Sequence, residues 1–269
     1  MNNESAHKEY WIKRGNMSYT YKGEIFYTIA HIPYYYRRRN ILLKYLSKEI
    51  EKLSLSEKNI KIHDYGCGDG WYLNYFYKLY PKIEFSGYDI SESFIERAKS
   101  VLLDKITLDC GNTDKIDKNG YDLIYSIAVF AHITNEDIPT VFSNIYDNLR
   151  IGGRFLIFEQ TSGGSYAIER KTNIRRLASE YEQIASKTGF VLIDKVAIDF
   201  SVHRFFERFL AKKLYNLYKG DTIDEKRINA NKNIFFRFLC NIACILSFFP
   251  IKIKNKNYWG NTLFVFEKI

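Results

Sequence analysis

The 269-residue sequence has little proline and little cysteine. It holds four prolines and 15 glycines, which argues against a low-complexity or disordered chain. None of the four cysteines is spaced as Cys-x-x-Cys, so we expect reduced, mostly buried thiols. No repeat period stands out, and the polar residues 1–8 lack the apolar core of a signal peptide. These absences predict a cytoplasmic globular protein of one domain with additions.

Aromatic side chains and positive charge are abundant instead. The chain has 22 Tyr and 20 Phe, and its net charge is +9. Residues 1–59 carry +5 and residues 200–257 carry +8, so the remainder carries −4. The charge therefore excludes a uniformly basic domain and suggests a polyanionic partner or surface near the two flanking segments.

The stretch 61–70, KIHDYGCGDG, is the most informative part of the chain. Strand-like alternation stops at Asp64, glycines follow at every second position, and an apolar and aromatic run begins at Trp71. This pattern predicts a strand, a tight turn and the start of a helix. Glycines allow the sharp bend and let the backbone approach a ligand without a Cβ, and a helix N-terminus offers free N–H groups. The three glycines are Gly66, Gly68 and Gly70.

Two classes of cofactor site use such a turn. The dinucleotide fingerprint Gly-x-Gly-x-x-Gly requires a third glycine where this chain has Trp71. The observed pattern, Asp-x-Gly-x-Gly-x-Gly from Asp64 to Gly70, instead resembles motif I of the class I S-adenosylmethionine (SAM) methyltransferases. The resemblance implies SAM as the cofactor, with Asp64 near its methionine part.

The end of the second predicted strand carries a candidate ribose ligand. Asp89 lies 19 residues beyond Gly70 and is followed by Ile90. A carboxylate at this place can accept hydrogen bonds from both ribose hydroxyls. We therefore expect Asp89 and Ile90 to contact the cofactor.

The third predicted strand departs from the family pattern. Members usually have Gly-Asp after it, with the acid accepting the adenine amino group, whereas this chain has Gly111-Asn112. The amide oxygen of Asn112 can accept the same hydrogen bond. Asp109 is an alternative acceptor, and a plain turn is the simpler interpretation.

Two residues are candidate general bases. The buried-strand pattern 121–129, followed by Phe130-Ala131-His132-Ile133, resembles motif IV of the family and places Ser126 beside the cofactor. His132 would lie near the donated methyl group, where it could take a proton from a hydroxyl acceptor or act as a structural hydrogen-bonding residue. Glu159 ends the fifth strand, at the edge where ligands bind in open α/β sheets.

The patterns together predict an α/β fold with a doubly wound, seven-stranded, mostly parallel sheet. We expect an N-terminal helical cap over 1–59, a SAM-binding core over 60–199 and 258–269, and a basic helical insertion over 200–257 between strands six and seven. The expected helices of the cap and core lie near 24–53, 71–80, 91–103, 136–149 and 173–188. In many small-molecule methyltransferases the N-terminal segment covers the cofactor, a role that Trp11, Arg14 and Tyr19 could share here, although such residues also simply pack.

The resemblance implies methyl transfer, mostly by proximity and orientation, to a hydroxyl of a sugar, glycan or other small molecule. Enzymes of bacterial polysaccharide assembly look most similar, which suggests a lipid-linked acceptor. The chain has no Asn-Pro-Pro-Tyr motif for base methylation and no aspartate cluster, so we expect no metal. An RNA methyltransferase, favoured only by charge, and a non-catalytic SAM-binding protein are the alternatives.

The insertion 200–257 has two interpretations. It is either a helical roof over the substrate or a surface that also contacts an anionic membrane at its inner face. Its apolar run 234–249 is short for a membrane span.

Overall fold

The structure is a computed structural model, and it divides into two compact units. Unit 1 comprises residues 1–16, 50–198 and 251–269, and unit 2 comprises residues 17–49 and 199–250. Within them the structure describes residues 9, 11, 19–21, 24–26, 32–55, 59–102, 105–111, 120–162, 167–170, 173–198, 205–221, 223–246, 250–251 and 260–269.

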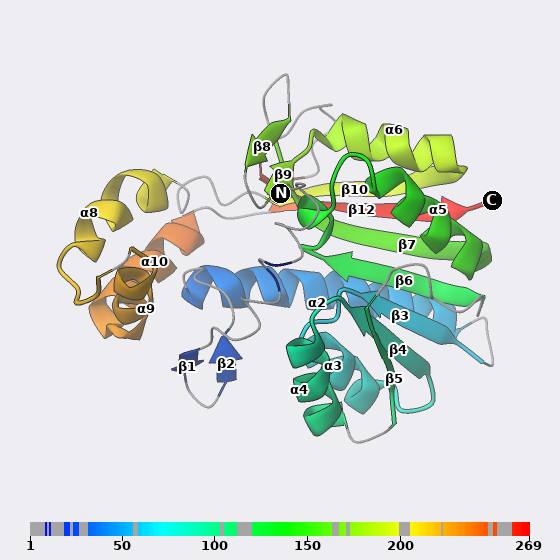
Figure 1. Cartoon of the computed structure of the whole chain (residues 1–269), viewed down its shortest axis with the longest axis horizontal. Helices are drawn as coiled ribbons and strands as arrows, with labels where there is room; N and C mark the ends of the chain where they lie inside the picture. The colour runs from blue at the N-terminus through cyan, green and yellow to red at the C-terminus, as the bar shows by residue number, and fades with distance from the viewer. Residues whose placement is uncertain are drawn as a thin grey trace. The chain divides into compact units, whose positions relative to one another are not determined.

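The main sheet has eight strands among the described residues, in the order β11-β10-β12-β7-β6-β3-β4-β5 (Figure 1). Strands β7, β6, β3, β4 and β5 run parallel, whereas β12 pairs antiparallel with both β7 and β10. The predicted doubly wound sheet is confirmed, with a two-residue edge strand added. The strands are β3 (Lys61–Tyr65), β4 (Glu84–Asp89), β5 (Thr107–Cys110), β6 (Tyr121–Ile127), β7 (Leu149–Thr161), β10 (Phe190–Ile198), β11 (Pro250–Ile251) and β12 (Gly260–Lys268).

Helices cover both faces of this sheet. Figure 1 shows α3 and α4 beside β4 and β5, and α5 and α6 beside β7 and β10. Neighbouring strand residues point to opposite faces, and Ile124 and Tyr125 of β6 illustrate this. Tyr125 meets Phe76 of α3 at 6.3 Å between ring centroids, whereas Ile124 joins the cluster under α5 and α6. The helices are α3 (Trp71–Leu79), α4 (Glu92–Leu102), α5 (Ile138–Asn148) and α6 (Ala178–Thr188).

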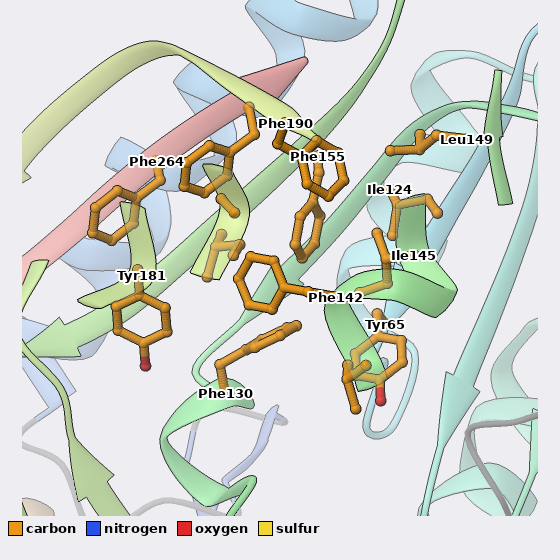
Figure 2. Close-up of a cluster of buried hydrophobic side chains, with 14 of the residues drawn as sticks. Tyr65, Ile124, Phe130, Phe142, Ile145, Leu149, Phe155, Tyr181, Phe190 and Phe264 are labelled. Atoms are coloured by element: carbon orange, nitrogen blue, oxygen red, sulfur yellow. The ribbon is translucent and has the colours of Figure 1, made fainter. Parts of the chain in front are cut away.

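The core under α5 and α6 is built largely from aromatic rings (Figure 2). Phe142 of α5 packs edge-on against Phe130 and Phe155, with ring centroids 5.3 and 5.5 Å apart. Tyr181 of α6 packs on Phe264 of β12 at 5.5 Å. Because each ring buries a large apolar area, these contacts fix the chain just beyond β6, where Phe130 lies.

Two predicted helix starts were wrong. The helix expected from residue 24 is α2 (Ile32–Ser54), and residues 24–26 form strand β2, paired with β1 (Tyr19–Tyr21). Pro33 explains the late start, since proline has no N–H to donate and is tolerated in the first helical turn.

The helix expected over 173–188 is also shorter. Residues Asn173–Arg175 form β9, which pairs with β8 (Ile168–Arg170), and α6 begins only at Ala178. Ile174 is buried while its two neighbours are half-buried, which is the alternation of a strand.

Unit 2 is helical among its longer described segments. The π-helix η3 (Phe206–Ala211) continues into α8 (Lys212–Tyr215), and α9 (Ile223–Lys232) and α10 (Ile234–Leu246) follow. Residues 32–49 of α2 belong to this unit as well. The Arg37 guanidinium of α2 donates to Asn241 Oδ1 of α10 at 3.0 Å. In the described part of the chain, every helix is too short or too polar to cross a membrane. The expected domain boundaries stay a prediction.

Candidate active site

The glycine turn between β3 and α3 has the expected conformation. Gly66, Gly68 and Gly70 have φ values of +85°, +55° and +74°, which favour glycine. The N–H groups of Gly66 and Cys67 both donate to the carbonyl oxygen of Tyr88 at 2.8 Å. The turn is therefore fastened to the end of β4.

The three glycines serve different purposes. A Cβ on Gly66 would lie 2.2 Å from Cγ2 of Val129, and one on Gly70 would lie 2.7 Å from Cδ1 of Leu102. A Cβ on Gly68 would meet nothing within 4 Å. Two of these glycines therefore permit close packing inside the protein. Of the three, Gly68 alone has open space where a Cβ would stand.

Asp89 joins the turn to the neighbouring strand. Its Oδ2 accepts the N–H of Gly68 at 2.9 Å, and its Oδ1 accepts the N–H of Ser91 at 2.9 Å. Burial raises the pKa of this carboxyl in spite of those two donors. Each carboxylate oxygen has a further lone pair, so Asp89 can still accept two hydroxyl donors. Ile90, between Asp89 and Ser91, is half-buried.

Three carboxyl groups gather around the turn. Asp64 is buried, and burial raises its pKa well above the ordinary range, while the phenol of Tyr125 lowers it by less. Asp69 and Asp89 lie close enough to raise the pKa of Asp64 further. Like charges disfavour one another's ionisation, so a cationic ligand bound here would stabilise the charged carboxylates.

Ser126 takes part in holding two strands together. It is fully buried, and its hydroxyl donates to the carbonyl oxygen of Tyr65 at 2.8 Å. The contact with the cofactor that we expected of Ser126 stays a prediction. Just beyond, Ala128 has φ of 60°, the one positive φ of a non-glycine residue in the described ranges. Such conformations cluster at functional sites because the surrounding structure must hold them in place.

Glu159 does not have the surroundings expected of a free base. The carboxylate is 1% exposed, and Oε1 accepts the N–H of Phe130 at 2.6 Å. The N–H groups of Val129 and Ala131 also face it and lower its pKa, but burial outweighs them and raises the pKa of Glu159 to about 7. The carboxylate is thus occupied by the backbone of the segment that leads to His132.

No sequence pattern pointed to Arg176, which binds carbonyl oxygens of the same segment. This arginine follows β9, is 2% exposed, and donates to the carbonyl oxygens of Phe130 at 2.8 Å and Ile133 at 2.7 Å. Its Nε and Nη2 both donate to Oδ1 of Asn135, at 3.1 and 2.8 Å. Side chains from β7 and from the segment before α6 therefore hold the segment 129–135 in one geometry.

His132 ends the short 3-10 helix η2 (Phe130–His132) and is half-buried. Its ring meets the ring of Trp11 edge-on, with centroids 4.7 Å apart and an interplanar angle of 88°. Trp11 therefore lies beside the candidate base, consistent with the expectation that the N-terminal segment lies at the site. The side chain of Tyr19, like Arg14, lies outside the described part of the chain.

The predicted adenine contact falls at a gap in the structure. Asn112 lies outside the described residues, so its role stays a prediction. The alternative, Asp109, is exposed near the end of β5, and its backbone pairs with that of Tyr88. The Tyr88 hydroxyl donates to the carbonyl oxygen of Gly111, which fixes the chain immediately before Asn112.

A known family matches the part of the chain that contains the glycine turn. Residues 62–153 match the methyltransferase domain family. The malonyl-[acyl-carrier protein] O-methyltransferase of Priestia megaterium is 31% identical over 111 residues, which cover 40% of this chain and 39% of the relative. The enzyme of the same name from Bacillus cereus is 26% identical over 147 residues, covering 51% and 54%. The chain thus spans about half the length of these relatives, or less.

Solved structures share the fold at low sequence identity. An O-methyltransferase from a trans-AT polyketide synthase multienzyme of Brevibacillus brevis, in complex with S-adenosyl-L-homocysteine, has a TM-score of 0.58 and 17% identity, covering 88% of this chain and 77% of that one. The [4+2]-cyclase SpnF has a TM-score of 0.55 and 14% identity, covering 83% and 80%. The chain therefore has the fold of the class I SAM-dependent methyltransferases, and its residues 62–153 match the methyltransferase domain family.

Proposed function

We propose that this chain binds SAM at the glycine turn and transfers its methyl group to an oxygen atom of a small acceptor. The observation that carries the proposal is the link between Gly68 and Asp89. The backbone of Gly68 is open to a ligand, and Asp89 lies 2.9 Å from its N–H with lone pairs to spare for ribose hydroxyls. The carboxyls of Asp64 and Asp69 favour the positively charged half of the same cofactor.

SAM supplies a methyl group activated on a sulfonium, and the protein supplies position. Holding the two reacting atoms in line is the largest contribution that this kind of reaction needs. His132 is our candidate for the base that takes the proton of a hydroxyl acceptor. We assign Glu159 to a positioning role instead of the base role expected from the sequence, because its carboxylate is taken up by backbone N–H groups.

The acceptor that we favour is an acyl group attached to a carrier protein. The relatives are named for malonyl-[acyl-carrier protein] and for a polyketide synthase multienzyme. Neither name supports the glycan that we expected from the sequence, and the RNA alternative has only the charge of the chain in its favour. A second candidate function is a reaction other than methyl transfer on the same fold, favoured by the likeness to a [4+2]-cyclase.

Two measurements test the proposal in order. Calorimetry should show binding of SAM and of S-adenosylhomocysteine to the full chain, and no affinity for either compound would refute a SAM-dependent reaction. Radiolabelled SAM should then transfer methyl to a malonyl-carrier protein and not to a lipid-linked glycan extract. SAM binding without transfer to any oxygen acceptor would favour the second candidate.

Variants of His132 separate the two kinds of oxygen acceptor. A hydroxyl must lose its proton during transfer, so His132→Ala should lower kcat by roughly 10²–10⁴-fold, with cofactor affinity unchanged. A carboxylate has no proton to lose at neutral pH, and the same variant should then keep most of its turnover. Normal turnover on a hydroxyl acceptor would exclude His132 as the base.

A further inference from the structure

Unit 2 exposes an apolar surface that its own packing leaves uncovered. Helix α10 buries Phe236, Cys240, Ala243 and Cys244. Six large apolar residues of the same helix are exposed instead, although the helix has only 13 residues. They are Ile234, Phe235, Phe238, Ile242, Ile245 and Leu246.

The exposed residues of α10 form a continuous row. Their spacings of three and four residues place them on one side of a helix. Phe235 and Phe238 are 64% and 57% exposed, far more than a soluble protein usually leaves open in one row. Among exposed residues of this helix, only Asn241 is polar, and its Oδ1 is bound by Arg37.

A second group of exposed apolar residues lies on η3 and just outside η3 and α8. Phe209 and Leu210 belong to η3, Phe205 precedes it, and Leu217 follows α8. Lys213 of α8 is exposed as well. This segment of unit 2 therefore also exposes a cation among apolar residues.

The charge of unit 2 is strongly positive. Its 85 residues contain 15 Lys and Arg and 7 Asp and Glu, a net charge of +8. Its last 25 residues, 226–250, contain four Lys and Arg and no acid at all. A positive surface of this kind repels a second copy of the same chain and attracts an anionic partner.

We propose that the exposed row of α10, with the cations around it, binds the surface of an anionic lipid membrane. Apolar side chains entering the headgroup boundary next to lysines and arginines are the usual composition of an interfacial helix. At 1.5 Å per residue, 13 residues reach about 20 Å, less than the roughly 30 Å of a hydrocarbon core. The helix therefore lies along the surface and does not cross it.

Lipid fits the row better than an acidic protein does. A specific protein interface uses about one hydrogen bond per 100–200 Å² to set its register. The exposed row of α10 has one polar side chain for such bonds, Asn241, and its Oδ1 already accepts a hydrogen bond from Arg37. A lipid surface requires only apolar area and positive charge. The proposal does not depend on the methyl transfer proposed above, because the test reads binding alone.

The test is co-sedimentation of the full chain with vesicles. Phosphatidylcholine vesicles containing phosphatidylglycerol should bind the protein, pure phosphatidylcholine vesicles should bind it far less, and binding should weaken as salt rises through about 0.1–0.5 M. Phe235→Ser with Phe238→Ser should lower vesicle affinity by about 10-fold or more, because two exposed rings no longer enter the lipid. Lys213→Glu with Lys232→Glu should lower it as well.

A matched control uses exposed apolar residues of unit 1. Leu55→Ser with Ile151→Ser removes two highly exposed side chains and should leave vesicle binding unchanged. Thermal unfolding of each variant checks that it is folded. No sedimentation of the native chain at low salt would overturn the proposal and leave an acidic protein as the partner to test. An equal loss of vesicle affinity in the α10 variant and in the control would show that the exposed row of α10 is not the membrane-binding surface.

Discussion

The backbone of Phe130 is held by two buried side chains, one acidic and one basic, because Glu159 accepts its N–H at 2.6 Å and Arg176 donates to its carbonyl oxygen at 2.8 Å. His132 follows two residues later. The two side chains therefore set where the candidate base lies without touching the ring of His132. Buried hydrogen-bonded networks of this kind rigidify the backbone that they bind.

The open side of Gly68 gives a first prediction. Gly68→Val should lower the affinity for S-adenosylhomocysteine by at least about 10-fold, because its side chain would occupy the ligand's approach. Gly120→Val is a matched control, since Gly120 has φ of +59° and its Cβ would likewise meet nothing within 4 Å. Gly120 comes just before β6, whereas the glycine turn follows the carboxyl end of the parallel strand β3. Calorimetry should find near-native affinity in the control. Similar losses in both variants would mean that backbone strain, and not ligand contact, is responsible.

Asp89 should be sensitive to loss of one acceptor. In Asp89→Asn the new NH₂ group would face the N–H of either Gly68 or Ser91, donor against donor. We expect S-adenosylhomocysteine affinity to fall about 10- to 100-fold, the cost of one or two hydrogen bonds to a charged group. Glu84→Gln, at the other end of β4 and exposed, is the control and should bind normally. An Asp89→Asn variant of native affinity would remove Asp89 from the site.

The raised pKa of Glu159 predicts a pH effect on stability. Between its ordinary value of 4.5 and about 7, the folded protein keeps a proton that the unfolded chain has released. The free energy of unfolding should therefore fall as pH rises through this window, by up to about 1.4 kcal/mol per pH unit. Glu159→Gln does not titrate, so denaturant unfolding at pH 5 and pH 7 should show a smaller fall in the variant. Parallel behaviour of the two proteins would contradict the raised pKa.

Arg176 should affect turnover more than cofactor binding. Lysine has three N–H donors on a single nitrogen and cannot reproduce the four hydrogen bonds that Arg176 makes from three nitrogens, so Arg176→Lys should lower the free energy of unfolding by about 2–4 kcal/mol. If the segment 129–135 positions His132, kcat on a hydroxyl acceptor should also fall, while S-adenosylhomocysteine affinity stays near native. Arg175→Lys, at the adjacent half-buried position, is the control. A purely structural role would leave kcat of the folded variant unchanged.

His63 predicts a pH effect of the opposite sign. Burial lowers the pKa of its imidazole to about 3, where its Nδ1 lies 2.8 Å from the hydroxyl of Ser86. Between pH 6.5 and 3 the unfolded chain binds a proton that the folded protein does not, so stability should fall on acidification by up to about 1.4 kcal/mol per pH unit. His63→Phe keeps a ring against Tyr121, 5.1 Å away, and should reduce this loss. Urea unfolding at pH 6.5 and pH 5 measures the change in the free energy of unfolding for the native chain and for His63→Phe. Equal changes in the two proteins would refute the lowered pKa of His63.

The sequence predicted the sheet well because strand ends are marked by local chemistry. Asp64 and Asp89 each interrupt an apolar run where a parallel strand reaches the ligand edge, and the glycines after Asp64 allow the turn. The strand β9 was missed because three residues carry too little periodicity to distinguish a strand from a helix.

Site residues could be predicted from the sequence only where the residue type itself indicates the function. Gly66 and Gly70 look like Gly68 in the sequence, but their packing partners, Val129 and Leu102, lie far along the chain. Arg176 was missed for a related reason. Arginine is ordinarily exposed, and its backbone partners lie 46 and 43 positions earlier, which no sequence pattern marks.

The place of β12 in the sheet bears on how the chain folds. This strand pairs with β7 on one side and β10 on the other, although it follows both in the sequence. During synthesis the edges of β7 and β10 that pair with β12 therefore have no partner strand until residues 260–268 have left the ribosome. Such late, long-range pairing slows folding and leaves strand edges open to aggregation in the meantime.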